Sequence, residues 1–177
     1  MKNGPIETAV GQRADSLVAT LLESARIPSV SLTGEGIAEA VEFLRTRLQH
    51  WGFAVQVFPT ASQPIVYAEI GPQDAPFTWL TYGHYDVYPA DAQAEGWATD
   101  PWQPVVDGDR IWGRGTGDNK GQHLALLNAI ALYRELIRRG GSRGRCNAAR
   151  IRVLHDHARG RFERFHCLAG RVGIAVA

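Results

Sequence analysis

The sequence has little cysteine and no long apolar run, and each shortage excludes a class of protein. Its two cysteines, Cys146 and Cys167, lie in the last quarter of the 177 residues without a C-x-x-C spacing. Neither a disulfide framework nor a thiolate zinc site is therefore indicated. No segment approaches the roughly 20 apolar residues of a membrane span, and residues 1–11 lack the features of a signal peptide. We expect a soluble, cytoplasmic protein without a membrane partner.

Charge is also scarce, and it is unevenly distributed. Apolar residues make up 45% of the chain and charged residues 21%, a composition typical of a globular domain. Residues 1–133 carry 8 Lys and Arg against 15 Asp and Glu, whereas residues 134–177 carry 11 against 3. This basic end contains no recognisable nucleic-acid-binding motif. We expect no nucleic-acid partner, and we keep binding of an anion or nucleic acid by the tail as an alternative function.

The spacing of apolar residues predicts helices that alternate with strands. Helices are expected over 15–25, from an N-cap at Thr33 to Gly52, and over about 119–139, the last with an apolar stripe of Leu126, Ile130, Tyr133 and Ile137. Strands are expected near 53–57, 65–70, 77–82 and 149–154. The alternation predicts an α/β fold with a layered sheet flanked by helices. Residues 83–121 form a long connection rich in glycine and aromatic residues, and loops of this length are usually functional or disordered.

The first candidate for chemistry is Gly83-His84-Tyr85-Asp86-Val87, directly after an expected strand. Sites in open α/β sheets gather at the carboxyl ends of strands. A neutral imidazole is a good zinc ligand, and an acid two residues later can accept the hydrogen bond of its other nitrogen. His84 is therefore a candidate metal ligand with Asp86 as its orienting partner. By itself, the pentapeptide more often marks a strand-end histidine paired with a turn aspartate.

The second candidate is the glycine-rich segment 107–121, which brings Asp118 to the expected start of the third helix. A helix start favours an anion, and an aspartate at this position is commonly an N-cap. Phosphate binding is the other function to consider. The glycine spacing is not G-x-G-x-x-G, and Lys120 is followed by glycine rather than Ser or Thr, which excludes a P-loop.

Together the two clusters resemble a known family. The ordered segments GHYDV and WATDPWQPVVDGDRIWGRGTGDNKG are very similar to the zinc-dependent family-20 metallopeptidases, which include acetylornithine deacetylase, succinyl-diaminopimelate desuccinylase, aminoacylases and cytosolic dipeptidases. The resemblance extends from about residue 27 to residue 138. It implies part of a zinc-peptidase catalytic domain. It also implies a metal-dependent hydrolase of amide or peptide bonds, of deacylase, dipeptidase or carboxypeptidase type.

The resemblance implies a role for each matched residue. His84 would bind one metal ion, Asp86 would orient His84, and Asp118 would bridge two ions. Zinc is the expected metal, with cobalt or manganese as alternatives. Two divalent ions roughly 3.5 to 4 Å apart need a shared anionic ligand, and such a pair activates water and polarises a scissile carbonyl. The expected partner is a small peptide or N-acyl amino acid substrate.

The sequence departs from the family beyond about residue 138. The family presents a strand followed by adjacent glutamates, the first the general base and the second a metal ligand. Here the strand leads into His155-Asp156-His157, and the only later glutamate is Glu163. We therefore expect only part of the ligand set, no general-base glutamate, and weak or absent activity of this chain alone. Ligation by His155 and His157 is a minor alternative.

The change to a basic composition begins near the end of the resemblance. We expect residues 1–142 to be the N-terminal part of the metallohydrolase catalytic domain, and residues 143–177 to be a basic tail from out-of-frame or truncated sequence. The chain would then be an incomplete fragment, without the inserted domain that commonly mediates homodimers in the family. A non-catalytic remnant of the same lineage is a further alternative.

Overall fold

The structure of the protein is a computed structural model, and it describes residues 4–139 and 150–156. The elements follow in the order α1 (Pro5–Gly11), α2 (Ala14–Ala25), α3 (Ile37–His50), β1 (Ala54–Phe58), β2 (Ile65–Ile70), β3 (Thr78–His84), β4 (Val105–Asp107), β5 (Arg110–Trp112), α4 (Lys120–Arg139) and β6 (Arg150–Asp156). None of the described helices is long and apolar enough to cross a membrane.

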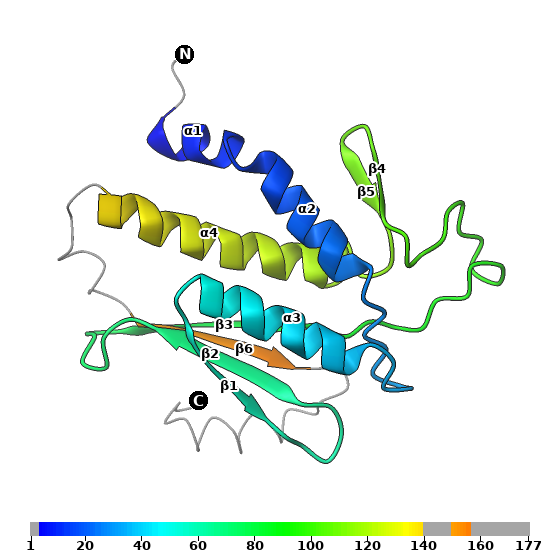
Figure 1. Cartoon of the computed structure of the whole chain (residues 1–177), viewed down its shortest axis with the longest axis horizontal. Coiled ribbons are helices and arrows are strands. Elements are labelled where there is room, and N and C mark those ends of the chain that lie inside the picture. The colour runs from blue at the N-terminus through cyan, green and yellow to red at the C-terminus, as the bar shows by residue number, and fades with distance from the viewer. Residues whose placement is uncertain (1–3, 140–149, 157–177) are drawn as a thin grey trace.

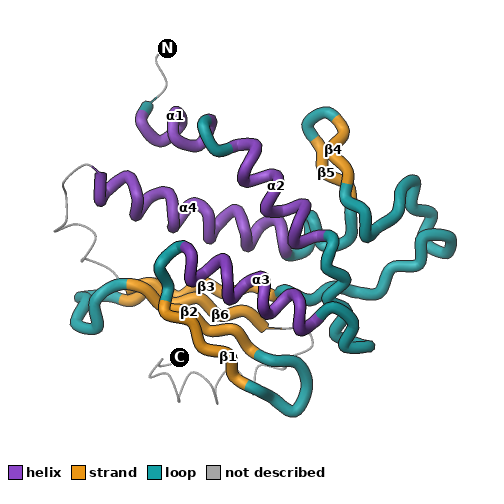
Figure 2. Tube along the Cα trace, in the orientation of Figure 1, coloured by secondary structure: helices purple, strands orange, loops and turns teal. Residues whose placement is uncertain are grey.

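Four strands form one mixed sheet in the order β1-β2-β6-β3. The β1–β2 and β2–β6 pairs are antiparallel, whereas β3 and β6 run parallel. The parallel pair brings the carboxyl ends of β3 and β6 to the same edge of the sheet. The short strands β4 and β5 form a separate hairpin that projects from the long connection before α4 (Figure 2).

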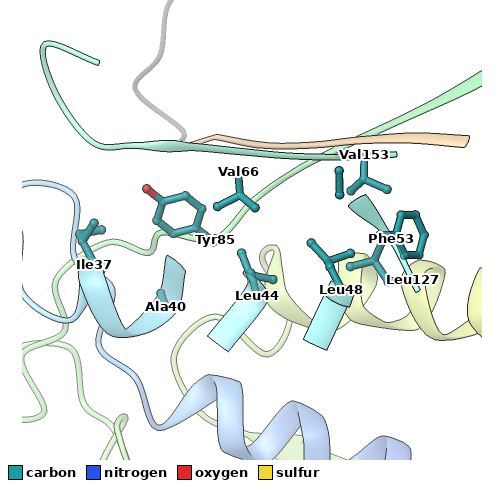
Figure 3. Close-up of a cluster of buried hydrophobic side chains, with 10 residues drawn as sticks. Ile37, Ala40, Leu44, Leu48, Phe53, Val66, Tyr85, Leu127 and Val153 are labelled. Carbon is teal, nitrogen blue, oxygen red and sulfur yellow. The ribbon is translucent and has the colours of Figure 1, made fainter. Parts of the chain in front are cut away.

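The described helices lie on one side of the four-stranded sheet (Figure 1). Leu44 and Leu48 of α3 face Val66 of β2 and Val153 of β6, and Leu127 of α4 joins them (Figure 3). Leu48, Leu127, Val66 and Val153 have no exposed surface. Burial of each such side chain contributes about 1.5–3 kcal/mol. The layered α/β fold expected from the sequence is confirmed.

The start of α3 differs from the prediction. The helix begins at Ile37, with Gly36 as its N-cap residue at φ 67°, rather than after a cap at Thr33. Thr33 instead belongs to a turn that begins at Val30, whose carbonyl accepts the Thr33 N–H. The side chain of Thr33 accepts the N–H of Glu35 at 3.3 Å. A threonine that closes a local turn and one that caps a helix use the same short-range hydrogen bond, so the sequence does not distinguish them.

The expected apolar stripe of α4 is wrong at two of its four positions, whereas Ile130 packs against the main core and Ile137 is partly buried. Leu126 and Tyr133 are 41% and 57% exposed, whereas Leu124, Leu127 and Leu132 are buried. The helix packs against both α2 and β3, so its buried surface is wider than a single stripe and is rotated from the expected one. The helix itself was predicted within one residue of its observed bounds.

Three elements, α1, β4 and β5, were not predicted. Helix α1 buries no residue, so it has no apolar periodicity from which to predict it. Strands β4 and β5 have three residues each and are largely exposed. Strand β3 was expected to end at residue 82, but it continues to His84 and so carries the candidate ligand on regular backbone.

Candidate metal centre

The end of β3 and the segment before α4 bring His84 and Asp118 together. Nε2 of His84 lies 3.1 Å from Oδ1 of Asp118. A second contact joins the two segments: the backbone N–H of His84 donates to the side-chain oxygen of Asn119 at 3.3 Å. The Asp118–Asn119 peptide bond is cis. Residues from the two sequence clusters therefore meet at the carboxyl end of a strand.

Asp86 contacts the opposite nitrogen of the His84 ring. Nδ1 lies 2.9 Å from the carbonyl oxygen of Asp86 and 3.3 Å from its Oδ1. The Asp86 side chain is 3% exposed, whereas that of Asp118 is 86% exposed. When the Nδ1–H of His84 donates to Asp86, the other ring nitrogen, Nε2, faces Asp118 and the solvent. This arrangement selects the tautomer whose Nε2 lone pair can bind a metal.

The acids around His84 also change its proton affinity. The hydrogen bond to the Asp86 side chain is the largest cause that raises the pKa of His84, to about 9, and burial opposes it. Asp118 raises the pKa further through its own hydrogen bond. At neutral pH the metal-free ring therefore carries a proton at the position where a metal ion would bind.

A pocket of about 400 Å³ opens beside these residues. Its wall includes Tyr88, Trp97 and Arg114 as well as the three candidate residues. The Arg114 guanidinium lies over the Trp97 ring, 5.2 Å from its centroid, and forms an ion pair with Glu95. The pocket therefore combines an aromatic wall with a polar floor, as small-molecule sites usually do.

Two buried polar residues of α4, Lys120 and His123, were not predicted from the sequence. Lys120 is 4% exposed, and burial lowers its pKa to about 7 against the opposing effect of Asp86. His123 is 4% exposed as well, and burial, assisted by His84, lowers its pKa to about 4. Both occur in the first turn of a helix whose other inward residues are apolar. Their position in this helix was the only sequence feature that could have indicated burial of Lys120 and His123. Whether the two side chains are buried depends on contacts with segments that are distant in the sequence.

Close packing also explains the glycine before His84. A Cβ atom at Gly83 would lie 2.0 Å from Nδ1 of His123. Glycine therefore allows α4 to approach β3 where the candidate ligand emerges. From the sequence alone, Gly83 could be recognised only as the first residue of the GHYDV segment.

Strand β6 belongs to the basic tail and reaches the same edge of the sheet. In the parallel register, Gly83 pairs with His155 and His84 pairs with Asp156. His157, Glu163, both cysteines and the side chains of His155 and Asp156 lie outside the described residues. Ligation by the two histidines, and the division of the chain at residue 142, therefore stay predictions.

The chemistry of His84 and Asp118 fits a metal ion. Zinc binds imidazole nitrogen and carboxylate oxygen at about 2.0–2.2 Å, and two tetrahedral ligands are then about 3.3–3.5 Å apart. The observed separation of 3.1 Å is close to this value. Among the described residues, no group of three or more His, Cys, Asp or Glu side chains is suitably arranged around one ion. The two residues thus fit as a pair of ligands.

Comparisons with known proteins agree with the resemblance found in the sequence. The profile of Peptidase family M20/M25/M40 matches residues 80–142. Beta-Ala-His dipeptidase of Mus musculus is 31% identical over 138 residues, which cover 69% of this chain and 28% of that protein. The crystal structure of an M20 family metallo-carboxypeptidase from Sulfolobus solfataricus is 34% identical, with a TM-score of 0.65 over 79% of this chain and 30% of that one.

The fold is similar to that of human carnosine dipeptidase 1, with a TM-score of 0.77 at 24% identity over 100% of this chain and 41% of that one. The chain thus spans less than half the length of each of these three proteins. The family match covers β3 from residue 80 onward, the long connection and α4, the segments that carry all three candidate residues. The chain therefore belongs to peptidase family M20/M25/M40 and contains part of its catalytic domain.

Proposed function

We propose that His84, Asp86 and Asp118 form part of the divalent-metal site of a hydrolase that cleaves amide or peptide bonds in small substrates. The observation that carries this proposal is the separation of 3.1 Å between Nε2 of His84 and Oδ1 of Asp118, beside a pocket of about 400 Å³. Zinc is the first candidate because nitrogen and carboxylate ligands suit it, and cobalt or manganese are the alternatives.

Each of the three residues has a distinct role in this proposal. His84 provides Nε2 as a ligand. Asp86 accepts the Nδ1–H bond and so orients the ring and increases its basicity. Asp118 is 86% exposed, so its second carboxylate oxygen is accessible for a second ion. When bound, divalent ions lower the pKa of a water molecule and polarise the scissile carbonyl.

The proposed substrates are dipeptides or N-acyl amino acids. The similar proteins include a dipeptidase, named for the dipeptide Beta-Ala-His, and a metallo-carboxypeptidase, named for cleavage at the carboxyl end of a chain. The pocket beside His84 has an aromatic wall at Trp97 and Tyr88, which suits a small side chain better than a folded protein. We expect slow turnover or none by this chain alone. Loss of a general base costs on the order of 10²- to 10⁴-fold, and the glutamate pair of the family is absent from the sequence.

Cobalt spectroscopy tests the proposal without requiring turnover. The chain is titrated with Co²⁺, and a dipeptide or an N-acetyl amino acid is then added while the visible absorption bands of the bound ion are recorded. We expect the small peptide to shift the bands and an oligonucleotide to leave them unchanged. Cobalt bands that no dipeptide or N-acyl amino acid affects would contradict the proposed substrate class.

The alternative function is anion or nucleic-acid binding through the basic tail. Its support is the count of 11 basic against 3 acidic residues in 134–177. A labelled oligonucleotide that binds with strong salt dependence, and that no longer binds after residues 157–177 are deleted with β6 kept in place, would favour it. The same oligonucleotide added to the cobalt-loaded chain would then also indicate whether the two sites are separate.

A further inference from the structure

Asp86 is buried, so the segments packed around it determine its position. The residue is 2% exposed, and both atoms near Nδ1 of His84, at 2.9 and 3.3 Å, belong to it. A shift of the 85–87 backbone would therefore turn the His84 ring relative to Asp118.

Ser29 holds the backbone on both sides of Asp86. Its Oγ donates to the carbonyl oxygen of Tyr85 at 2.9 Å, and its own carbonyl accepts the N–H of Val87 at 3.0 Å. Ser29 has no exposed surface and has a φ of 40°, which is uncommon outside glycine. A non-glycine residue keeps such a conformation only when its surroundings determine it. Gly36 is part of these surroundings, because a Cβ there would lie 2.7 Å from the Ser29 nitrogen.

Lys120 connects the same segment to the start of α4. Its ammonium group donates to the carbonyl oxygens of Ser24 at 2.9 Å and Ile27 at 2.7 Å, at the C-terminal end of α2, where a cation is favoured. Its own N–H donates to the Gly115 carbonyl at 3.1 Å. Lys120 follows Asp118 by two residues, so the segment that carries Asp118 is attached to Ile27.

Residues 27–29 thus support both candidate ligands, His84 and Asp118. The connection between residues 87 and 115 is long and rich in glycine, so it does not by itself fix the distance between His84 and Asp118. The contacts of Ser29 and Lys120 do so from the opposite side. A Cβ at Gly115 would lie 2.7 Å from Val87 and 3.2 Å from Lys120, which indicates how closely the two segments pack there.

We propose that Ser29 and Lys120 are positioning residues of the metal site, which hold Asp86 and Asp118 at the spacing that metal binding needs. This inference rests on the proposed function, because it assumes that His84 and Asp118 bind metal. Ser29 acts through the Tyr85 and Val87 backbone, and Lys120 acts through the carbonyl groups of Ser24 and Ile27. Removal of either contact should therefore weaken metal binding in a chain that remains folded.

The test compares Co²⁺ binding by the 177-residue wild type with that of Ser29→Ala, Lys120→Met and Lys120→Arg. Thr20→Val is the matched control, because Thr20 is a buried residue of α2 whose hydroxyl donates only locally, to the Ser16 carbonyl at 2.8 Å. Folding is checked by circular dichroism. We expect Ser29→Ala and Lys120→Met to lower cobalt affinity about tenfold or more, in the range typical of residues that support ligands. They should also alter the cobalt absorption bands.

Lys120→Arg keeps the cation and should retain more affinity than Lys120→Met, while Thr20→Val should bind as the wild type does. Ser29→Ala decides the matter if Lys120→Met does not fold, because it removes a single oxygen atom. Folded Ser29→Ala with wild-type affinity and wild-type bands would overturn the inference. If the wild type binds no cobalt, the proposed function fails instead. The positioning role is then decided by NMR of the metal-free chain, where Ser29→Ala must shift the His84 ring and Val87 amide signals and Thr20→Val must not.

Discussion

Nε2 of His84 and Oδ1 of Asp118 lie 3.1 Å apart, although 34 positions separate the two residues in the sequence. Strand β3 ends at His84, and α4 begins two residues after Asp118 and packs on β3. The proximity therefore results from the packing of α4 on β3, together with the contacts of Ser29 and Lys120, rather than from the loop between the two residues. A pair held in this way is available to an ion without a large rearrangement.

Metal binding should depend on pH through His84. The hydrogen bond to Asp86 chiefly raises the pKa of His84 to about 9, so at lower pH a metal ion must displace a proton from the ring. Cobalt affinity should therefore rise by about tenfold per pH unit from pH 6.5 until about pH 9, and then level off. Absorption titrations at several pH values measure the slope. An affinity that does not change over this range would mean that the His84 proton is not displaced.

Asp86 should matter for the same site although it is buried. Asp86→Ala removes the carboxylate that lies 3.3 Å from Nδ1 of His84, and loss of such a partner typically costs 10–100-fold in metal affinity. Calorimetric titration with zinc measures the effect. Asp109→Ala is the control, because the Asp109 side chain is 99% exposed. Equal affinities of the two variants would contradict the orienting role of Asp86.

The two neighbouring leucines of α4 should differ strongly in their contribution to stability. Leu127 has no exposed surface and belongs to the main core, so Leu127→Ala should lower the free energy of unfolding by about 2–5 kcal/mol. Leu126 is 41% exposed, and Leu126→Ala should cost less than about 1 kcal/mol. Urea denaturation of both variants measures the difference. Similar losses would mean that the helix is rotated from the orientation described.

The sequence predicted the helices and strands of the core because their apolar patterns are regular. The bounds of β2 were predicted without error, and those of α4 and β6 within two residues. It did not predict which side of α4 is buried, because the helix contacts two partners and the pattern of Leu126 and Tyr133 fits only one stripe. The orientation of a helix with several neighbours depends on the tertiary arrangement.

For the site, the sequence predicted His84, Asp86 and Asp118 through their shared motif context, and their roles stay proposals. It did not predict that Lys120 and Ser29 support them. Lys120 contacts the carbonyls of Ser24 and Ile27, more than 90 positions away. Ser29 contacts Tyr85 across 56 positions. Such contacts have no local periodicity, and a buried lysine has the same sequence appearance as a solvated one.

The close packing of β3 against α4 should make Gly83 intolerant of a side chain. Gly83→Ala places a Cβ 2.0 Å from Nδ1 of His123, so His123 or the strand must move, at a cost of about 1–3 kcal/mol. Gly11→Ala is the control, because its Cβ would contact nothing within 4 Å. Thermal unfolding followed by circular dichroism compares the two variants. A Gly83→Ala chain as stable as the wild type would be inconsistent with the observed packing.

Zinc stoichiometry of the purified chain tests the central claim most directly. Isothermal titration of the wild type and of His84→Ala measures how many ions bind and whether His84 is required. We predict at least one ion per wild-type chain and a loss of that binding in His84→Ala, while circular dichroism of the variant is unchanged. Less than one ion per wild-type chain, or binding that His84→Ala leaves unaltered, would contradict a metal site at His84 and Asp118.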